Sequence, residues 1–494
     1  MTLHRLHNLM FWILLVAFIG TTSAVLFFTF GYRFSIERGI FVYTGSIMIK
    51  SNPRSVSIAI DGKPVPLSAL SSINQTIHIP GLEPGDYRLK VEAPGFRPWE
   101  KTVTVQSGIS TEFWNIILPK ENPEQTVAAE GPIRKVFFSI LERKFAVAET
   151  SPGGGVRVSV LNQADDKETQ AFVNDDVLFD KNGAENIEWS PDGTGLLVPL
   201  RDRKTGERTV FFVNLDNGEA TDLRTYSGLH DVHDARWNPT DNRSFFTLSG
   251  NSLRLIHTQE TDGSKRAETF RDDVSSFDLA GRYLYLITPD SDQVFETSLD
   301  NWVFSPEAIP GTIPGIRSMS EPKLTVYDRK RVVVYDRKGG DAFLLNDDGD
   351  FAPALIELGS GLKGVQFSDD GKKLLFFTDS EISVAFTHKW EVQPYRDSGE
   401  IIQVARFASP VSYPQWAKDY EYVLFALGGE LKMAELDHRD KRNITTVASF
   451  PQSTITQILP DFGKWLIYTL SETSDGNAKF VSFPFPEQPS FFGQ

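Results

Sequence analysis

The chain has 494 residues, enough for two to four domains at roughly 100–200 residues per domain. Apolar residues make up 40% of it and aromatic residues 12%, which excludes wholesale disorder. The net charge of −15 argues against a broad nucleic-acid-binding surface, and the absence of cysteine excludes disulfides, Cys-ligated metals and a cysteine nucleophile. The acidity is concentrated in residues 121–494, which hold 39 basic and 58 acidic residues.

An uncharged apolar run of 22 residues, Leu9 to Phe30, lies near the N-terminus. As a helix rising about 1.5 Å per residue it would reach roughly 33 Å, enough to cross a bilayer core of about 30 Å. A cleaved signal peptide is the alternative, since the small residues at 22–24 suit cleavage. The run continues past them, so we favour an uncleaved transmembrane signal anchor over residues 9–30, with Tyr32, Phe34 and Tyr43 at the membrane interface.

The charges that flank this span do not fix its orientation. Arg5 precedes the span, whereas Arg33 and Arg38 follow it and are offset by Glu37. The very short tail, residues 1–8, is typical of a signal anchor whose N-terminus stays in the cytoplasm. We therefore expect a single-pass cell-membrane protein with the bulk of the chain extracytoplasmic.

Residues 45–120 alternate between apolar and polar side chains, as half-buried strands do. Asp61-Gly62 stands between two such strand patterns and predicts a hairpin turn, because glycine accepts a positive φ. Further turns are predicted around Gly85 and Gly95. About six short strands without a helix indicate a compact β-sandwich.

Two segments of this region carry a family resemblance: SIMIKSNPRSVSIAIDGKPV and GLEPGDYRLKVEAPGFRPWEKTVTVQSG. Their order and spacing resemble a PEGA domain, although Pro66 and the Ser/Ala-rich stretch after it depart from the family pattern. The resemblance implies a cell-surface module that acts as a spacer or contacts protein or carbohydrate. Residues 121–130 are polar, lack an apolar pattern and predict a linker.

The remainder, residues 131–494, contains a recurring unit. The clearest copy is NIEWSPDGTGLLV at 186–198, and further copies follow Trp237 and Phe367. Eight anchor positions recur about every 46 residues, the length of a four-stranded propeller blade. The anchor positions are Phe138, Trp189, Trp237, Phe277, Leu324, Phe367, Trp416 and Leu459.

These repeats resemble those of a TolB/WD-like bacterial β-propeller, whose pattern is similar to W-S-P-D-G followed by an apolar strand. Eight blades are favoured; the alternatives are seven blades, with the first and last units sharing one, and a pair of β-sandwiches. We expect Trp189 to be buried between neighbouring sheets, and Gly193 to have positive φ in the turn Ser190-Pro191-Asp192-Gly193. The overall fold class is all-β, with an N-terminal transmembrane helix, a small sandwich and a C-terminal propeller.

Few motifs in the chain carry chemistry. His230, His233 and Asp234 are the densest group of candidate metal ligands. A zinc site needs a third well-placed ligand beside the two histidines, and the sequence marks none, so a polar loop is favoured. Asn346 to Asp350 lacks the spacing of a calcium loop and predicts a turn. Ser151 to Gly155 is glycine-rich but lacks a Walker ending, which predicts a hairpin loop. No catalytic motif is present, and no cofactor is expected.

The sequence thus predicts an envelope protein whose extracytoplasmic propeller binds or scaffolds a protein or glycan partner, with residues 45–120 as a stalk. A TolB-like protein that captures a disordered peptide in its channel is one form of this hypothesis. The alternative is a surface glycan-active enzyme with its site at the channel mouth. Convergent carboxylates or histidines at that mouth would favour the enzyme.

Overall fold

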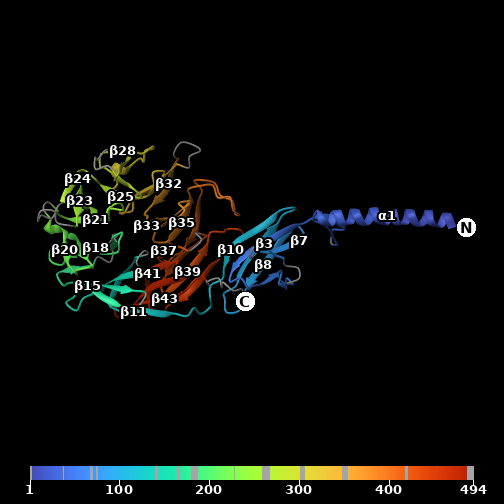
Figure 1. Cartoon of the computed structure of the whole chain (residues 1–494), viewed down its shortest axis with the longest axis horizontal. Helices are drawn as coiled ribbons and strands as arrows, with labels where there is room; N and C mark the ends of the chain where they lie inside the picture. Colours follow the sequence, from blue (N-terminus) through green and yellow to red (C-terminus); the bar gives the residue numbers. More distant parts are fainter. Residues whose placement is uncertain are drawn as a thin grey trace.

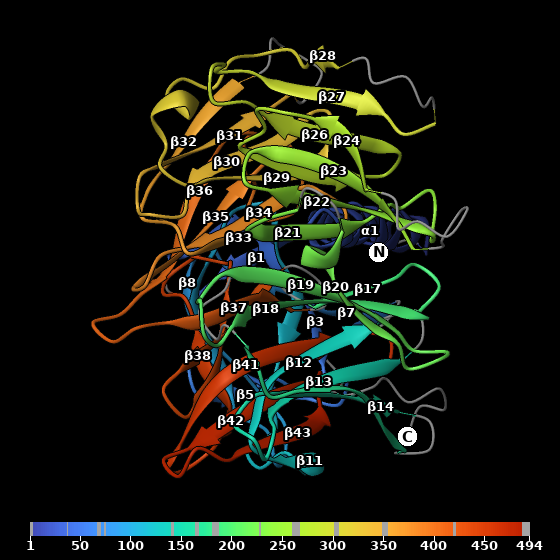
Figure 2. The same cartoon turned by 90° about the vertical axis from the view of Figure 1, so that its left-hand side faces the viewer.

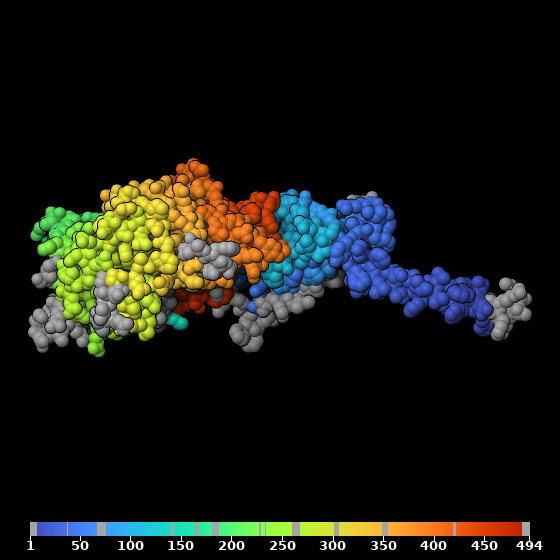
Figure 3. Space-filling model, turned by 90° about the horizontal axis from the view of Figure 1, so that it is seen from above, coloured from blue at the N-terminus to red at the C-terminus, as the bar shows by residue number. Residues whose placement is uncertain are grey.

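The computed structural model describes residues 3–36, 38–66, 71–73, 76–139, 143–163, 167–179, 187–226, 229–258, 267–300, 306–347, 354–417 and 421–486. Helix α1 (Leu3–Thr29) projects from the rest of the molecule along its long axis (Figures 1 and 3). Residues His7–Thr29 are long and apolar enough to cross a membrane, and the helix is not buried against the protein. A signal sequence has the same length and composition.

A short hairpin of β1 (Tyr32–Ser35) and β2 (Ile40–Tyr43) joins α1 to a small β-sandwich, the sandwich domain. The two sheets of this domain have the orders β10-β3-β7-β6 and β5-β4-β8-β9 and enclose one apolar core. The strands are β3 (Gly45–Asn52), β4 (Ser57–Ile60), β5 (Lys63–Pro64), β6 (Ser71–Ile73), β7 (Thr76–Leu82), β8 (Gly85–Glu92), β9 (Trp99–Val105) and β10 (Ser110–Ile117).

The predicted Asp61-Gly62 hairpin is confirmed. Both residues have positive φ, 51° and 76°, as a two-residue type I′ turn requires, and they connect the paired strands β4 and β5. The stretch after Pro66, where the sequence departs from the family pattern, lies largely outside the described residues.

The described residues from 126 to 484 form eight antiparallel sheets in a ring, a β-propeller seen along its axis in Figure 1. Successive sheets are β12–β15, β16–β20, β21–β24, β25–β28, β29–β32, β33–β36, β37–β40, and β41–β43 with β11. One edge strand of each sheet, its inner strand, lies nearest the ring centre, as Figure 1 shows for β21, β25, β33, β37 and β41. The corresponding edge strands of the other sheets are β12, β29 and β17, which pairs with β18 beside β16. All eight anchor positions predicted from the repeat lie on these inner strands.

Figure 2 shows the ring from the side distant from α1. In chain order, the ring strands form a first half, residues 126–271, and a second half, residues 276–484. The first half contains β11 (Thr126–Gly131), β12 (Ile133–Ser139), β13 (Lys144–Thr150), β14 (Val156–Asn162), β15 (Glu168–Asn174), β16 (Val177–Leu178), β17 (Glu188–Trp189), β18 (Gly195–Asp202), β19 (Arg208–Asn214), β20 (Ala220–Asp222), β21 (Val232–Trp237), β22 (Ser244–Ser249), β23 (Ser252–His257) and β24 (Ala267–Arg271), with the 3₁₀ turn η2 (Leu223–Thr225).

The second half contains β25 (Ser276–Ala280), β26 (Tyr283–Ile287), β27 (Val294–Ser298), β28 (Glu307–Ala308), β29 (Pro322–Asp328), β30 (Arg331–Asp336), β31 (Asp341–Asn346), β32 (Ala354–Ser360), β33 (Gly364–Phe367), β34 (Lys373–Phe377), β35 (Glu381–Phe386), β36 (Ile401–Arg406), β37 (Ser412–Trp416), β38 (Tyr422–Leu427), β39 (Glu430–Glu435), β40 (Ile444–Ser449), β41 (Ser453–Asp461), β42 (Leu466–Thr473) and β43 (Ala478–Pro484), with the 3₁₀ turn η3 (Ile316–Ser318).

The ring is closed by strands from opposite ends of the chain. Strand β11 pairs antiparallel with β43, so Thr126–Gly131 completes a sheet whose other three strands are C-terminal. Residues 121–130 were expected to be a linker, and this is wrong for their second half. Two alanines and a valine give this segment too weak an apolar pattern to predict a strand, and its pairing partner lies about 350 residues away.

The repeated turn has the geometry expected of Ser-Pro-Asp-Gly. Gly193 has φ of 69°, and the Ser190 hydroxyl accepts hydrogen bonds from the amides of Thr194 (3.0 Å) and Gly195 (2.8 Å). The same hydroxyl donates to the Asp192 carboxylate at 2.6 Å. Each turn is thereby held by its own side chains, which explains why it recurs at the start of several sheets.

Tryptophans link neighbouring inner strands in three places. The indole N–H donates to a carbonyl of the preceding inner strand: Trp189 to Phe137 (3.4 Å), Trp237 to Glu188 (3.2 Å) and Trp416 to Gln366 (3.1 Å). Trp237 and Trp416 are buried, but Trp189 is only half-buried.

The expectation that Trp189 is buried is therefore wrong. Trp237 lies against the rings of Phe212 and Phe245, with centroids 5.9 and 5.4 Å away. Trp189 stands at the end of a two-residue strand and packs against the edge of its cluster instead.

Candidate functional site

Charged side chains of neighbouring inner strands meet in the wall of the central channel. Arg236 on β21 reaches Glu188 on β17 (Nε to Oε1, 3.0 Å) and Asp278 on β25 (Nη1 to Oδ1, 2.8 Å). Both carboxylates also accept backbone amides of the next inner strand: Glu188 from Trp237 (3.2 Å) and Asp278 from Val326 (2.8 Å). This network joins four sheets.

Asp278 is buried and Glu188 and Arg236 are partly buried, which sets the electrostatics of the network. Burial raises the pKa of Glu188 above its ordinary value, although Arg236 and the Trp237 amide oppose the shift. Burial acts to lower the pKa of Arg236, but the carboxylates of Asp278 and Glu188 outweigh it, and its pKa is raised. The guanidinium therefore remains charged and compensates the two acids.

Asp234, one of the three candidate metal ligands, is engaged in an ion pair. Its buried carboxylate contacts the Lys323 ammonium at 2.6 Å, which links β21 to β29 past the strand between them. Burial opposes ionisation of Asp234, but Lys323 and Arg236 hold its pKa below the ordinary value. His230 is exposed, and its backbone is hydrogen-bonded to Ser249.

His233 lies on β21, next to Asp234 in the sequence. Within the described ranges, no group of three or more His, Asp or Glu side chains is placed to hold a metal ion. Of the three candidate ligands, Asp234 is already paired with Lys323.

A recess of about 600 Å³ opens at the face of the ring where β21, β25 and β29 begin. Its lining includes the Asp234–Lys323 pair and the charged side chains of Arg317, Glu321 and Arg337. Arg317 is exposed but held by Asp292 at 2.6 Å. The lining identified in the described part of the chain is polar and aliphatic and contains no aromatic side chain. The sheets that form it lie on the side of the ring away from α1 (Figure 1).

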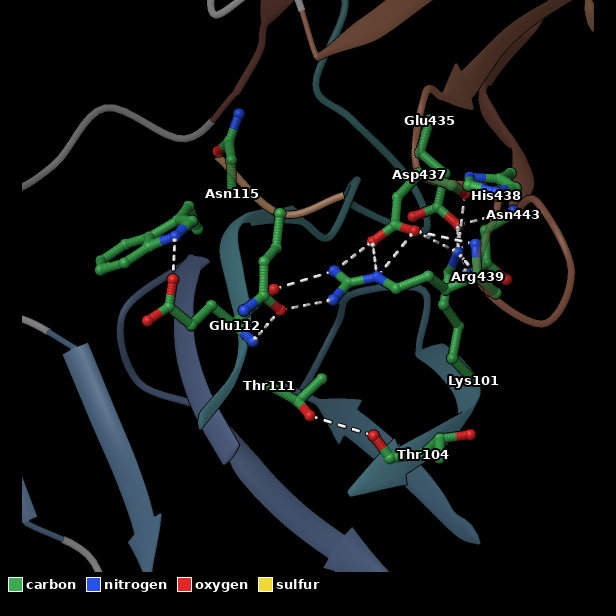
Figure 4. Close-up of polar contacts among 12 residues, drawn as sticks. Lys101, Thr104, Thr111, Glu112, Asn115, Glu435, Asp437, His438, Arg439 and Asn443 are labelled. Carbon is green, nitrogen blue, oxygen red and sulfur yellow. Dashed lines mark hydrogen bonds and ion pairs between the residues drawn. The ribbon is translucent and has the colours of Figure 1, made fainter. Parts of the chain in front are cut away.

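A second polar cluster joins the sandwich domain to the ring (Figure 4). Lys101 on β9 is fully buried, and its ammonium contacts Glu435 (2.8 Å) and donates to the carbonyls of Asp437 (2.7 Å) and Arg439 (2.9 Å). All three ammonium protons therefore have an acceptor across the boundary. We call this contact region, between residues 99–117 and 421–443, the junction.

Glu435 is equally well satisfied within the junction. It accepts hydrogen bonds from Lys101, from the indole of Trp99 (2.9 Å) and from the backbone amide of Asn443 (2.8 Å). Burial nevertheless raises the pKa of Glu435, with Lys101 opposing the shift. A buried charge with this many partners is costly to disrupt from either side.

Arg439 adds a second bridge of the same kind (Figure 4). Its guanidinium donates to the Glu112 carbonyl (2.8 Å) and to Asp437 (2.5 Å), and lies 4.1 Å from the ring centre of Phe113. Tyr422 on β38 also contacts the sandwich domain at the junction, because its hydroxyl donates to the Asn115 carbonyl at 2.6 Å. The sandwich domain is therefore packed firmly against sheet β37–β40.

An inter-domain cavity of about 200 Å³ lies within the junction. Its lining combines Trp99, Phe113 and Trp390 with the charged groups of Glu435 and Arg439. These charged groups are already satisfied by the contacts above, so the cavity reflects incomplete packing around them.

The two remaining motifs have structural roles. Ser151 to Gly155 is the hairpin loop between β13 and β14, with the Ser151 hydroxyl accepting the Gly155 amide at 2.9 Å. The predicted turn at Asn346 begins at the end of β31, but residues 348–350 lie outside the described residues.

The junction residues were missed in the sequence, although one signal was present. Strand β9 alternates, with Trp99, Val103 and Val105 buried in the sandwich domain. Lys101 occupies an inward position of the same strand. A lysine at such a position needs a buried partner, but nothing in the sequence identifies Glu435 as that partner.

Comparison with known proteins identifies one of the two folded parts. The family model for the PEGA domain matches residues 44–121. Residues 44–121 are a PEGA domain. No curated protein matches this chain.

Solved structures similar to the chain are β-propeller proteins and reach only low scores. The β-propeller domain of Myceliophteria thermophila Cps50 (Swd1) is 13% identical, with a TM-score of 0.41 over 72% of this chain and 99% of that one. Saccharomyces cerevisiae Sqt1 is 11% identical, with a TM-score of 0.43 over 74% and 99%. The dihydro-heme d1 dehydrogenase NirN is 13% identical, with a TM-score of 0.45 over 70% and 74%.

Proposed function

We propose that this protein is a membrane-anchored scaffold that presents a propeller face to a protein partner outside the cytoplasmic membrane. Helix α1 is its uncleaved anchor, with the N-terminus in the cytoplasm. The PEGA domain and the propeller form one body, so the PEGA domain positions the propeller as well as separating it from the bilayer.

The junction is the observation that carries this proposal. Lys101, Glu435 and Arg439 connect the PEGA domain to the propeller through buried charges rather than a flexible linker. A scaffold benefits from this arrangement, because a fixed orientation reduces the ordering cost of binding a partner. The long axis in Figure 1 runs from α1 through the PEGA domain to the sheets that carry the recess.

The recess favours a protein segment over a glycan as the partner. Its charged groups, Arg317, Glu321 and Arg337, suit charged side chains or chain termini. Aromatic faces, which offer packing surfaces to sugar rings, are absent from its lining in the described part of the chain. An acid–base role for Asp234 would require breaking its 2.6 Å pair with Lys323, which disfavours the glycan-active enzyme.

Site-specific photocrosslinking in intact cells tests this proposal. A benzophenone side chain at Arg317, in the recess, should give a discrete protein adduct. The matched control is Arg282, an exposed arginine just after the end of β25, whose first residue Ser276 lines the recess; it should give none. Equal adducts at both positions, or none at Arg317, would contradict the assigned face.

Protease added to spheroplasts tests the topology separately. It should digest the PEGA domain and the propeller while α1 stays in the membrane fraction. Complete protection of both domains would overturn the extracytoplasmic placement.

A further inference from the structure

The β1–β2 hairpin exposes more apolar surface than its size explains. Four of its side chains are solvent-exposed and large: Phe34 (56%), Ile36 (90%), Ile40 (56%) and Phe41 (61%). The hairpin is short and two-stranded, and such a unit is marginally stable by itself in water. A cluster of apolar side chains on so small an element marks a surface that contacts something apolar.

The position of the hairpin relative to α1 indicates what that contact is. The rings of Tyr32 and Phe41 pack against Phe27 of the helix, with centroids 5.2 and 5.9 Å away. Phe27 lies three residues before the end of the uncharged run, about 4.5 Å at 1.5 Å per residue. If α1 spans a bilayer, these rings therefore sit where acyl chains meet headgroups.

The polar groups of the hairpin are arranged as this depth requires. The Arg33 guanidinium lies 3.3 Å from the ring centre of Phe28 and donates to the Phe28 carbonyl at 2.8 Å. Arg38, near the hairpin tip, donates to the Pro84 carbonyl. Arginines at this level keep an apolar stem in the membrane boundary and a charge near lipid phosphates.

The hairpin is also fixed to the PEGA domain. The Ser35 hydroxyl donates to Glu83 at 2.7 Å near the tip, and the Thr44 hydroxyl closes the base of the hairpin by donating to the Gly31 carbonyl at 2.6 Å. A hairpin held at both ends cannot adjust its depth independently of the PEGA domain. Whatever it contacts therefore also sets the orientation of that domain.

We propose that the β1–β2 hairpin inserts into the headgroup–acyl boundary of the leaflet that α1 leaves, as a second membrane contact. This inference rests on the proposed spanning role of α1. A helix alone permits rotation about its own axis, whereas a helix plus an inserted hairpin fixes which side of the PEGA domain faces the bilayer. The orientation of the propeller recess relative to the membrane is then fixed as well.

The absence of cysteine makes the test direct, because each introduced cysteine is unique. Full-length chains carrying I36C, I13C or Y283C are spin-labelled and reconstituted in phosphatidylcholine–phosphatidylglycerol vesicles. Ile13 reports the N-terminal half of α1, Ile36 the hairpin, and Tyr283 an exposed position at the start of propeller strand β26. Collision of each label with oxygen, which enters lipid, is compared with collision with a charged nickel chelate, which does not.

The label at Ile36 should be accessible to oxygen and at least several-fold less accessible to nickel than the label at Tyr283. Equal nickel accessibility at Ile36 and Tyr283, with Ile13 protected, would overturn the inference and leave the anchor intact. Three nickel-accessible labels would show that α1 does not span, and the proposed function would fail. Loss of both oxygen and nickel collisions at Ile36 would indicate a protein contact, such as a second copy, and would also overturn it.

Discussion

The junction and the seams between neighbouring sheets of the ring solve the same problem with different chemistry. The tryptophan seams of the ring, unlike the seams joined by Arg236 and Lys323, connect inner strands through apolar packing and a neutral contact, such as the Trp416 indole on the Gln366 carbonyl at 3.1 Å. The junction joins two domains through buried charges, with the Lys101 ammonium 2.8 Å from Glu435. The seam is repeated around the ring, whereas the junction occurs once.

The difference matters because substitutions should destabilise the two kinds of contact for different reasons. Removing a neutral packing group leaves a cavity whose cost depends on how far neighbours relax. Removing one member of a buried charge pair leaves the other charge unpaired, and relaxation cannot supply a counter-charge. We therefore expect the junction to be less tolerant of single substitutions than a seam of similar area.

The sharpest test of the junction is Lys101→Met, which keeps the side-chain length and removes the charge. It should destabilise the chain by about 3–5 kcal/mol, since Glu435 remains buried without its cation. Adding Glu435→Gln should recover part of this loss, and the non-additivity measures the coupling. Chemical denaturation of the detergent-solubilised chain gives all four free energies of unfolding.

The matched control is Lys90→Met on the neighbouring strand β8. Lys90 pairs with Glu92 at 2.5 Å, but both side chains are well exposed. This substitution should cost less than about 1 kcal/mol. Equal losses at Lys90 and Lys101 would show that burial of the junction pair has no special role.

Within the ring, the cost in stability of replacing a seam tryptophan should depend on how deeply that tryptophan is buried. Trp416→Ala should cost about 3–5 kcal/mol, because its side chain is 2% exposed. Trp189→Ala should cost clearly less, since its side chain is only partly buried. Thermal melts of the two variants decide the matter; a larger loss at Trp189 would reverse the proposed order of seams.

Alanine substitutions at two equivalent turn glycines should also differ in how much they lower stability. Gly193 and Gly371 both have positive φ, 69° and 65°, so alanine is strained at either position by around 1 kcal/mol. A Cβ at Gly371 would in addition meet the Tyr327 ring at 2.3 Å. Melting curves should therefore show a larger shift for Gly371→Ala than for Gly193→Ala, and identical shifts would mean that Tyr327 simply moves aside.

The smallest effect is expected at a partly exposed turn carboxylate of the ring, Asp202. The amides of Thr205 and Lys204, followed by the Arg224 guanidinium, lower the pKa of Asp202 to about 2. Because this folded-state pKa lies below the unfolded value of 3.8, the contribution to stability is complete above about pH 4 and is lost as the pH falls to about 2.

Asp202→Asn should therefore lower the melting temperature at neutral pH, and the difference from wild type should shrink as the pH falls towards 2. Melts at intervals between pH 7 and pH 2 measure the difference. A gap that is constant with pH would assign the effect to the lost turn geometry rather than to the charge.

Local and repeated features of this molecule could be predicted from its sequence. The apolar run predicted α1, Asp61-Gly62 predicted its hairpin, and all eight anchor positions predicted from the repeat lie on inner strands. Each of these depends on neighbouring residues or on a pattern that recurs, so the information is present several times over.

Features that depend on a single distant partner could not be predicted. Nothing in residues 126–131 indicates β43, and nothing near Lys101 indicates Glu435. The same holds for the candidate ligand Asp234, whose partner Lys323 lies 89 positions later in the chain. The half-exposure of Trp189 follows from the length of β17, which the repeat pattern does not specify.

The closure of the ring by β11 has a mechanical consequence. The chain runs from α1 and the PEGA domain through residues 121–125 into β11, so tension applied at α1 would reach the strand that closes the circle. The junction also connects the PEGA domain directly to sheet β37–β40, so it would transmit force to the ring without stretching residues 121–125. Tension is therefore borne first by the Lys101 and Arg439 contacts, and the ring stays closed while they hold.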